Sequence, residues 1–596
     1  MKKTNVLKLI SLTCTIALLF SITACGNGDS SATSTAGNNE QTTTEKDSTN
    51  EKDTPTEAST AGIASLSDEA PSDPMAKYDP GITFSTVIAL DDAMQEMIGV
   101  KSDVLTNNSW FNGYKEDLGI DVDIVWSIPG AQYEEKLNTQ ISANDLPDVF
   151  RVNDKQLKLL VDNGMVADMT QVFADYSTDF TKQMMEDDNH IALSQATFGG
   201  KLMALPRVDG NRDGVPIMWI RRDWLEKTGK SVPTTVEELE AVALAFVHED
   251  PDENGKDDTY GIALHKDLWG SGLCDVSSMF EMFDAHVSGS RINNAWLEKD
   301  GTLVNGIIQP EVEEALVYFA DWYSKGIFDK EFIAKDSAKV AEDLTAGTVG
   351  IAFGAHWNAF WPYPDSLTIN PESDWAPFEI PSANSSPVNV MVNGSANSFF
   401  VVNVDCENPE AAVKLYNYFY AKDCALSPDF DKTFHIPSSE MMEKPEESYQ
   451  WAIIQTVYPM QNLFIHRGVV RYNEGDKTAI DNSWVADNAL QGEQYLEDKV
   501  ANSQFWSSYM WSGAEGAFSI VDLYDKNGQM LQNAYILADT DAMTSYGTTL
   551  EQLALETITK MINGSTPVSD FSTFIDQWNS LGGDEITAEV NAVMGR

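Results

Sequence analysis

The stretch VDIVWSIPGAQYEEKLNTQISANDLPDVFRV, residues 122–152, decides the fold class. Its two ends, 122–128 and 148–152, are rich in β-branched and apolar residues, which is typical of strands. The segment between them, YEEKLNTQISAN at 133–144, is typical of a helix. A further strand pattern, ITFSTVIAL, precedes it at 82–90. This strand–helix–strand order predicts an α/β layer with a mostly parallel sheet.

Further along the chain the same alternation continues. GVPIMWIRRDW at 214–224 begins a second run, and GTVGIAFG at 347–354 and SANSFFVVNV at 395–404 are later strand patterns. Thr235 followed by Glu238 predicts a capping box at the start of a helix. The buried face of that helix follows helical periodicity at Val236, Leu239, Val242, Ala243, Phe246 and Val247. NPEAAVKLYNYFYA at 408–421 predicts another helix.

The composition is that of a large acidic globular protein. Its 596 residues include 92 acidic and 39 basic side chains, for a net charge of −53, and 42% are hydrophobic. Such a chain would repel nucleic-acid phosphates, so we expect no nucleic-acid partner. About 520 residues after the N-terminal region fit one large module or several domains.

The N-terminus has the three parts of a secretory signal. Lys2, Lys3 and Lys8 precede a short apolar run at 9–20, and Ile22-Thr23-Ala24 precedes Cys25. Small residues before a cysteine predict a bacterial lipobox, in which residues 1–24 are removed and Cys25 carries diacylglycerol, with palmitate as a typical acyl chain. The alternative is an ordinary signal peptide. Residues 25–76 then form a polar linker that cannot order itself.

Three cysteines remain after Cys14 and Cys25 are accounted for. Cys274, Cys406 and Cys424 are an odd number without metal-site spacing. A disulfide between Cys406 and Cys424 is possible outside the cell, but buried free thiols are favoured.

Several motifs in order resemble the extracellular solute-binding proteins of carbohydrate ABC importers, in particular the large lipoproteins of Gram-positive bacteria. These motifs are LNTQISANDLPDVFRV (137–152), GKLMALP (200–206), PIMWIRRDWLEKTGKSVPTTVEELEAV (216–242), PEVEEALVYFADWYSKGIFDKEF (310–332), ENPEAAVKLYNYFY (407–420) and WNSLGGDEITAEVN (578–591). The resemblance implies a periplasmic-binding-protein-like fold with two α/β lobes, a hinge and a ligand cleft between the lobes.

The same resemblance implies discontinuous lobes. The chain would cross between them near 205, 390 and 425, so the module at 77–596 divides into one lobe at about 77–205 and 390–425. The second lobe takes about 206–389 and 426–596. Ligand would bind in the cleft, and the lobes would close over it by a hinge motion.

The loop DPDENGKDDT, residues 250–259, has the spacing of a calcium loop. Asp250, Asp252, Asn254 and Asp258 occupy positions 1, 3, 5 and 9, and Lys256 at position 7 would supply its carbonyl. Position 12 is glycine rather than glutamate. The resemblance adds position 10, Thr259, because some family members, an alginate-binding one among them, hold calcium through it. We expect structural Ca²⁺ here; the alternative is a polar turn.

Sugars bind against flat aromatic faces with planar polar groups at their edges. GAHWNAFWPYP at 354–364 is the richest such cluster, and it supplies the candidates His356, Trp357, Asn358 and Trp361. Trp269 and Trp110 are further candidates, and core packing is the alternative for each tryptophan. Because the cluster contains no arginine or lysine, we expect a neutral oligosaccharide.

Sequence patterns of catalysis are absent: there is no G-x-S-x-G elbow, and the seven histidines are scattered. We therefore expect a binding protein and not an enzyme. It would be a monomeric lipoprotein on the extracellular face of the cell membrane that binds an oligosaccharide and delivers it to an ABC permease. The alternatives are a secreted glycoside hydrolase and a carbohydrate- or peptide-sensing surface protein.

Overall fold

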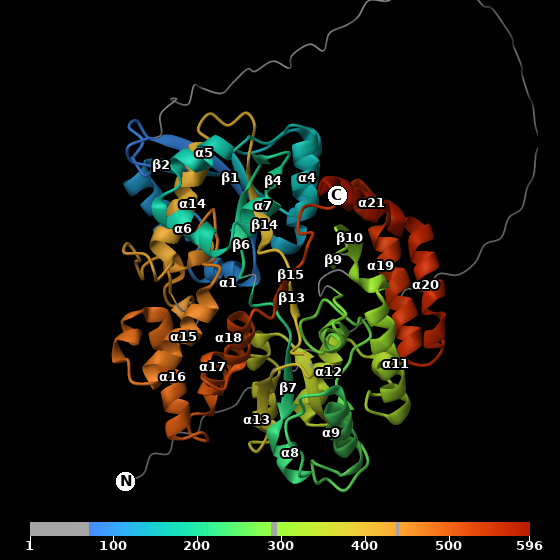
Figure 1. The fold of residues 1–596 in the computed structure, drawn as a ribbon. Coiled ribbons are helices and arrows are strands. Elements are labelled where there is room, and N and C mark those ends of the chain that lie inside the picture. Colours follow the sequence, from blue (N-terminus) through green and yellow to red (C-terminus); the bar gives the residue numbers. More distant parts are fainter. Residues whose placement is uncertain (1–70, 211, 288–294, 385, 437–439) are drawn as a thin grey trace, which may run out of the picture. The chain divides into compact units, whose positions relative to one another are not determined.

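The computed structural model describes residues 71–596 except 211, 288–294, 385 and 437–439 (Figure 1). The signal peptide, Cys25 and nearly all of the predicted linker lie outside these residues. Within them, no helix is both long and apolar enough to cross a membrane. Cys274, Cys406 and Cys424 are free and buried, as the sequence favoured.

The strand–helix–strand stretch folds as its sequence predicts. β2 spans Ile120–Pro129, α3 spans Tyr133–Ala143 and β3 spans Val149–Val152. The helix ends where Asn144 adopts a left-handed conformation, with φ of 51°. β1, at Ile82–Leu90, lies between β2 and β3 and is parallel to both.

This first sheet has one reversed strand, and the other four run in the same direction, as expected for a mostly parallel sheet. Its order is β2-β1-β3-β14-β6, with β6 at Leu205–Val208 and β14 at Ala396–Val402. β14 is antiparallel to both of its neighbours. It reaches the sheet from far along the sequence, and Figure 1 shows its yellow ribbon among the blue and teal elements.

Short helices pack around the first sheet. They are α1 (Asp92–Val100), α2 (Ser109–Gly113), α4 (Asp154–Asp162), α5 (Thr170–Tyr176), α6 (Asp179–Asp187), α7 (Ile191–Gln195) and α14 (Glu410–Asp423). A small hairpin pairs β4 (Thr197–Phe198) with β5 (Lys201–Leu202).

The chain continues to contact elements of the first sheet well beyond the end of α14. The ring of Phe434 packs 5.0 Å from that of Trp110, and the backbone N–H of Val457 donates to the carbonyl of Val208 at 3.2 Å. Residues between 425 and 457 therefore contact elements of the first sheet, beyond the crossing expected near 425.

The second sheet has the order β12-β7-β11-β8. Its strands are β7 (Ile217–Arg221), β8 (Tyr260–Ile262), β11 (Val349–Gly354) and β12 (Trp375–Phe378). β8 and β11 are parallel, whereas β7 runs antiparallel to β11 and β12. The neighbouring helices are α8 (Arg222–Lys227), α9 (Val236–His248), α10 (Val276–Phe280), α11 (Pro310–Lys325), α12 (Ser337–Ala346) and α13 (Tyr363–Ile369), with a hairpin of β9 (Trp296–Lys299) and β10 (Thr302–Asn305).

The start of α9 differs in detail from a capping box. The Thr235 hydroxyl accepts from the backbone N–H of Glu238, as predicted, but the Glu238 carboxylate accepts from Thr234 instead of Thr235. The buried face is largely as predicted, except that Ala245 is buried and Val247 only partly so.

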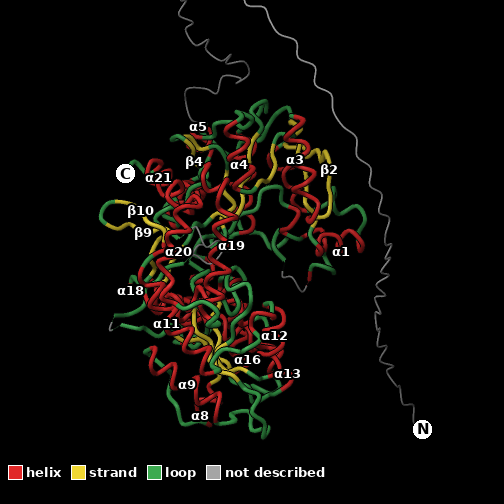
Figure 2. Tube along the Cα trace, turned by 90° about the vertical axis from the view of Figure 1, so that its right-hand side faces the viewer, coloured by secondary structure: helices red, strands yellow, loops and turns green. Residues whose placement is uncertain are grey.

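From residue 461 onward the chain is mostly helical. It contains α15 (Gln461–Asn473), α16 (Ser483–Glu497), α17 (Trp506–Ser512), α18 (Ala517–Asn527), α19 (Asp541–Ile562), α20 (Phe571–Trp578) and α21 (Asp584–Val593). α19 packs against α11, and Figure 1 shows the two helices next to each other. Figure 2 labels both helices in the view turned by 90°.

Several segments connect the two sheets. The chain leaves β6 and enters β7 through 209–216, returns between β13 (Val390–Val392) and β14, and passes again after Val457. β15 (Met530–Gln532) pairs in parallel with β13, so a later pass is hydrogen-bonded to an earlier one.

Candidate functional site

Two cavities lie at corresponding edges of the two sheets. In the first sheet, β1, β2, β3 and β6 all point their carboxyl ends to one edge; in the second, β8 and β11 do so. Ligands of α/β proteins bind in the crevice outside such carboxyl ends. These two cavities are therefore the candidate site.

The first-sheet cavity encloses about 230 Å³. Its lining includes Asp91 just after β1, Arg151 of β3, Arg207 of β6, and Tyr449, Gln450 and Gln455 from the segment that follows α14. It thus combines amides and a phenol with two guanidinium groups.

The second-sheet cavity encloses about 370 Å³. It is lined by Gly272 and Asp275 after β8, by Ser277, Ser278 and Glu281, and by Ala355 and Trp357 after β11. Of the six residues predicted to contact ligand, Trp357 alone lines this cavity.

Both carboxylates of the second-sheet cavity already have partners. Asp275 accepts from the backbone N–H groups of Ser271 and Gly272 and lies 2.9 Å from His265 Nε2. Glu281 lies 2.6 Å from His286 Nδ1. Neither carboxylate is left free to define the charge of a ligand.

His286 lies between two carboxylates, which favour its protonated form. Burial alone would lower the pKa of His286, but Glu281 and Asp284 raise it to about 10. Glu281 also accepts from the backbone N–H of Met391 in β13, at 3.4 Å. This buried network therefore connects the second-sheet cavity to the crossing strand.

The Trp357 ring lies against a glycine, Gly272. Gly272 has φ of +67°, and a Cβ there would lie 2.9 Å from the Trp357 ring. Trp361 lies nearly parallel to Trp357, with ring centroids 6.4 Å apart and planes 14° apart. Because Trp361 is 41% exposed, the pair offers flat apolar area beside the cavity.

His356 makes a structural contact. The indole N–H of Trp511 donates to its Nδ1 at 2.8 Å, which joins the turn after β11 to α17. Burial lowers the pKa of His356 to about 3, so the ring stays neutral and can accept that bond.

Three other predicted ligand contacts are buried in packing positions. Trp110 is 0% exposed and stacks on Phe419, 5.2 Å between centroids. Trp269 is 8% exposed, and Asn358 is 0% exposed beneath the end of β11. None of the three lines either cavity, and core packing, the alternative considered for the tryptophans, describes the surroundings of Trp110 and Trp269. Both polar side-chain atoms of Asn358 are buried without a hydrogen-bond partner among the described residues.

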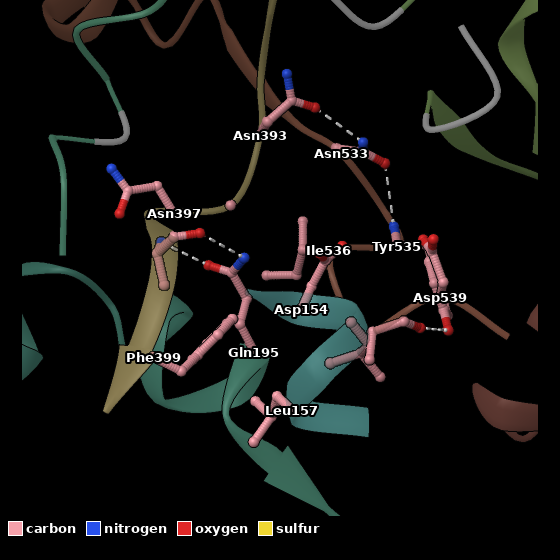
Figure 3. Close-up of a pocket in the computed structure, with 14 residues that line it drawn as sticks. Asp154, Leu157, Gln195, Asn393, Asn397, Phe399, Asn533, Tyr535, Ile536 and Asp539 are labelled. Carbon is pink, nitrogen blue, oxygen red and sulfur yellow. Dashed lines mark hydrogen bonds between the residues drawn. The ribbon is translucent and has the colours of Figure 1, made fainter. Parts of the chain in front are cut away.

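A third cavity lies at the crossing segments (Figure 3). There the side-chain amide of Asn533 donates to Asn393 at 3.0 Å, and Gln195 accepts from the backbone N–H of Ala396 at 2.8 Å. None of the predicted ligand-binding residues lines it. Its amides fasten neighbouring crossing segments to one another.

The predicted calcium loop connects α9 to β8 and has converging carboxylates. Burial raises the pKa of Asp252, and the nearby Asp250 and Asp258 raise it further. The Asn254 amide lies between them, 2.6 Å from Asp252 and 3.0 Å from Asp258. Such repulsion among carboxylates is what a hard cation would relieve.

Two observations on the loop are less favourable to calcium. The Thr259 hydroxyl is buried and donates to the carbonyl of Phe246 at 2.7 Å. The Lys256 ammonium lies 3.8 Å from Asp258. In the part of the chain that the structure describes, no group of three or more His, Cys, Asp or Glu residues is arranged to hold a metal ion.

Sequence reasoning missed the first-sheet cavity. Its two arginines occur in the strand patterns DVFRV and ALPRV, in each of which a single arginine interrupts apolar residues next to the end of a strand. A charged residue in that position was the available signal, because a strand buried on both faces has no structural need for it.

Comparisons with known proteins agree with this geometry. The family model described as bacterial extracellular solute-binding protein matches residues 92–423. Lipoprotein LipO of Bacillus subtilis is 22% identical over 79% of this chain and 86% of its own. The polygalacturonan/rhamnogalacturonan-binding protein YtcQ of the same organism is 28% identical over 39% of this chain and 44% of its own.

A solved structure shows the same fold. FusA of S. pneumoniae, an ABC-transporter substrate-binding protein in complex with kestose, has a TM-score of 0.53 and 14% identity, and the match covers 86% of this chain and 98% of that one. FusA has also been solved as an EF-hand mutant. With more than half of its length matched by the family model, the chain belongs to the bacterial extracellular solute-binding proteins, which bind ligands and are not enzymes.

Proposed function

We propose that this protein is a cell-surface lipoprotein that binds an extracellular oligosaccharide and delivers it to the permease of an ABC importer. The observation that carries the proposal is the pair of cavities at the carboxyl edges of the two sheets. The sugar ligands named for YtcQ and FusA support it. Family membership removes the glycoside-hydrolase alternative, whereas a sensing role remains the second candidate.

The ligand would be held from both sides. The stacked Trp357 and Trp361 would cover an apolar face of a sugar ring, and the hydroxyls of Ser277 and Ser278 could exchange hydrogen bonds with its edge. From the first sheet, the unpartnered side-chain carbonyl oxygen of Gln450 could accept a hydrogen bond from a sugar hydroxyl. Movement about the crossing segments would let the ligand favour a closed form, which the permease would recognise.

A ligand screen tests the proposal. We expect one class of oligosaccharide to raise the melting temperature, because ligand at 100 times its dissociation constant adds about 2.7 kcal/mol of stability. The bound sugar should be recovered intact after long incubation. Binding of a peptide but of no sugar would refute the carbohydrate proposal. Unchanged sugar uptake in cells that lack the protein would favour a sensor over an importer subunit.

We also propose a structural calcium ion in the loop at 250–259. Asp250, Asp252, Asn254 and Asp258 would supply side-chain oxygens and Lys256 its carbonyl; Thr259 fits less well because its hydroxyl already donates to Phe246. The ion would supply positive charge among carboxylates that otherwise repel one another. The EF-hand of FusA supports this proposal.

Attachment to the membrane rests on the sequence alone. Cys25 would carry the lipid, and residues 25–76 would tether the lobes to the outer face of the membrane. We propose that the protein acts there as a monomer.

A further inference from the structure

The arginines of the first-sheet cavity differ from the other arginines of the chain. The sequence has nine arginines, eight of them among the described residues. Six of these eight have a carboxylate oxygen within 4.0 Å: Arg212, Arg221, Arg222, Arg467, Arg471 and Arg596. Arg151 and Arg207 have none among the described residues, in a protein with 92 acidic side chains.

The strand register places both side chains on one face of the sheet. Arg151 of β3 pairs with Phe400 of β14, and Arg207 of β6 pairs with Ser398 of the same strand. Phe400 and Ser398 are two residues apart and so point to the same face. Both arginines are also the penultimate residues of their strands, at the carboxyl edge where the cavity lies.

The two guanidinium groups are partly buried and have few partners. Among the described residues, the Nε of Arg207 is buried without an acceptor, and its Nη1 donates to the side chain of Asn397 at 3.1 Å. Burial lowers the pKa of Arg151 and the charge of Arg207 lowers it further, whereas Tyr133 and Asp91 offset part of this. Because a cation removed from water without a partner costs free energy, a bound anion would stabilise this pair.

The one carboxylate that lines the cavity, that of Asp91, already accepts hydrogen bonds from other groups. Asp91 Oδ1 accepts from the backbone N–H of Met94 at the start of α1, at 2.8 Å. Its Oδ2 accepts from the Gln450 amide, also at 2.8 Å. Asp91 therefore offsets part of the positive charge but does not pair with either arginine.

We infer that the first-sheet cavity is an anion subsite, in which Arg151 and Arg207 bind the carboxylate of an acidic sugar in the oligosaccharide. The planar guanidinium fork matches a carboxylate in two parallel hydrogen bonds. The side-chain carbonyl oxygen of Gln450, which has no partner among the described residues, and the phenol of Tyr449 could bind hydroxyl groups of the same sugar. This inference rests on the proposed function and replaces the expectation of a neutral ligand drawn from residues 354–364.

The net charge of −53 does not exclude an acidic ligand. Charges more than about 8 Å apart are largely screened at physiological ionic strength, so the wider acidity mainly slows the approach. Within the cavity the two arginines outnumber the single lining carboxylate, Asp91. The partnered carboxylates of the second-sheet cavity leave that side without a free charge, which fits neutral parts of the same oligosaccharide.

Calorimetry with matched sugars tests the inference. Each acidic oligomer is compared with its carboxyl-reduced counterpart, which keeps the same backbone and linkage. The acidic oligomers are those of galacturonate, those of mannuronate and guluronate, and those that contain glucuronate. We expect at least one acidic oligomer to bind, and its reduced form to bind about 100-fold more weakly. Equal affinity for both forms, or binding of neutral or sulfated sugars alone, would overturn the inference.

Variants separate recognition from folding. Arg151→Gln and Arg207→Gln should each weaken acidic-sugar binding about 100-fold, and the lysine variants should restore only part of it, because lysine keeps the charge but loses the fork. For the two glutamine variants, the melting temperature without ligand should stay equal or rise, because each substitution removes one of two like charges that repel each other. Arg471→Gln, at a surface arginine 56% exposed, is the matched control and should change neither.

The outcomes distinguish this inference from the proposed function. If the arginine variants bind the acidic sugar as well as the wild type does, the anion subsite is wrong although sugar binding stands. If the wild type binds no sugar, acidic or neutral, the proposed function fails and the inference fails with it.

Discussion

Replacing Asp213 with asparagine should change how the stability of this protein depends on pH. Asp213 lies in the segment that leaves β6 and enters β7. Its Oδ1 is buried without a partner, and its Oδ2 accepts from the Asn462 amide at 2.5 Å. Burial, with a smaller contribution from the charge of Asp209, raises the pKa of Asp213 from 3.8 to about 8, although the hydrogen bond from Asn462 opposes the rise.

The direction of this pH dependence follows from the protons bound by the folded and the unfolded protein. Between pH 4 and pH 8 the folded protein keeps this proton and the unfolded chain does not, so the stability contributed by Asp213 is complete below pH 4 and is lost as pH rises to about 8. At about 1.4 kcal/mol per pKa unit, a fully shielded carboxyl would lose about 6 kcal/mol. For a domain of this length that corresponds to a melting-temperature change of about 5 °C.

Thermal melts from pH 4 to pH 9 check this prediction. Asp213→Asn keeps the shape and the bond to Asn462 but cannot ionise. The melting temperature of the variant should equal that of the wild type at pH 4 and exceed it above pH 8. The difference between the two melting temperatures should grow between these pH values. Asp365→Asn, at an exposed aspartate of α13, is the control and should leave a constant difference. Parallel curves for wild type and Asp213→Asn would refute the reasoning.

Three further predictions concern the anchor, the loop and the aromatic pair. Cys25→Ala should release the protein from membranes, and fractionation that still finds it there after a high-salt wash would contradict the lipobox. Chelation should lower the melting temperature of the wild type by several degrees but not that of Asp250→Ala, and identical melts in EDTA and in Ca²⁺ would leave the loop as a plain turn. Trp357→Ala should weaken sugar binding by about 10-fold or more, as loss of a stacked ring does, whereas Phe360→Ala, at a residue 51% exposed outside the cavity lining, should not.

The elements of the fold were predictable because each has a local signature. β-branched runs marked β1, β2, β3, β11 and β14, and the Thr235 cap marked the start of α9. Strand direction was not predictable in the same way. A single strand pattern is the same whether its neighbour runs parallel or antiparallel, and β14 comes from more than 240 residues beyond β3.

The candidate site was predicted less well, for a physical reason. A tryptophan side chain packs as readily into a core as against a sugar, so Trp110 and Trp357 look alike in sequence, although one is 0% exposed and the other lines a cavity. Arg151 and Arg207 are 56 positions apart in sequence and meet only because β14 lies between their strands. Their shared face depends on a register that no local pattern contains.

The place of β14 in the first sheet also governs how the protein can fold. β3 and β6 are made early, but the strand that joins them is supplied by residues 396–402, after the whole second sheet has been synthesised. Until then both strands expose unpaired backbone edges, which favour wrong pairing between chains. A protein in which strands so far apart in sequence must pair folds slowly, so the yield of refolding should fall as the protein concentration rises.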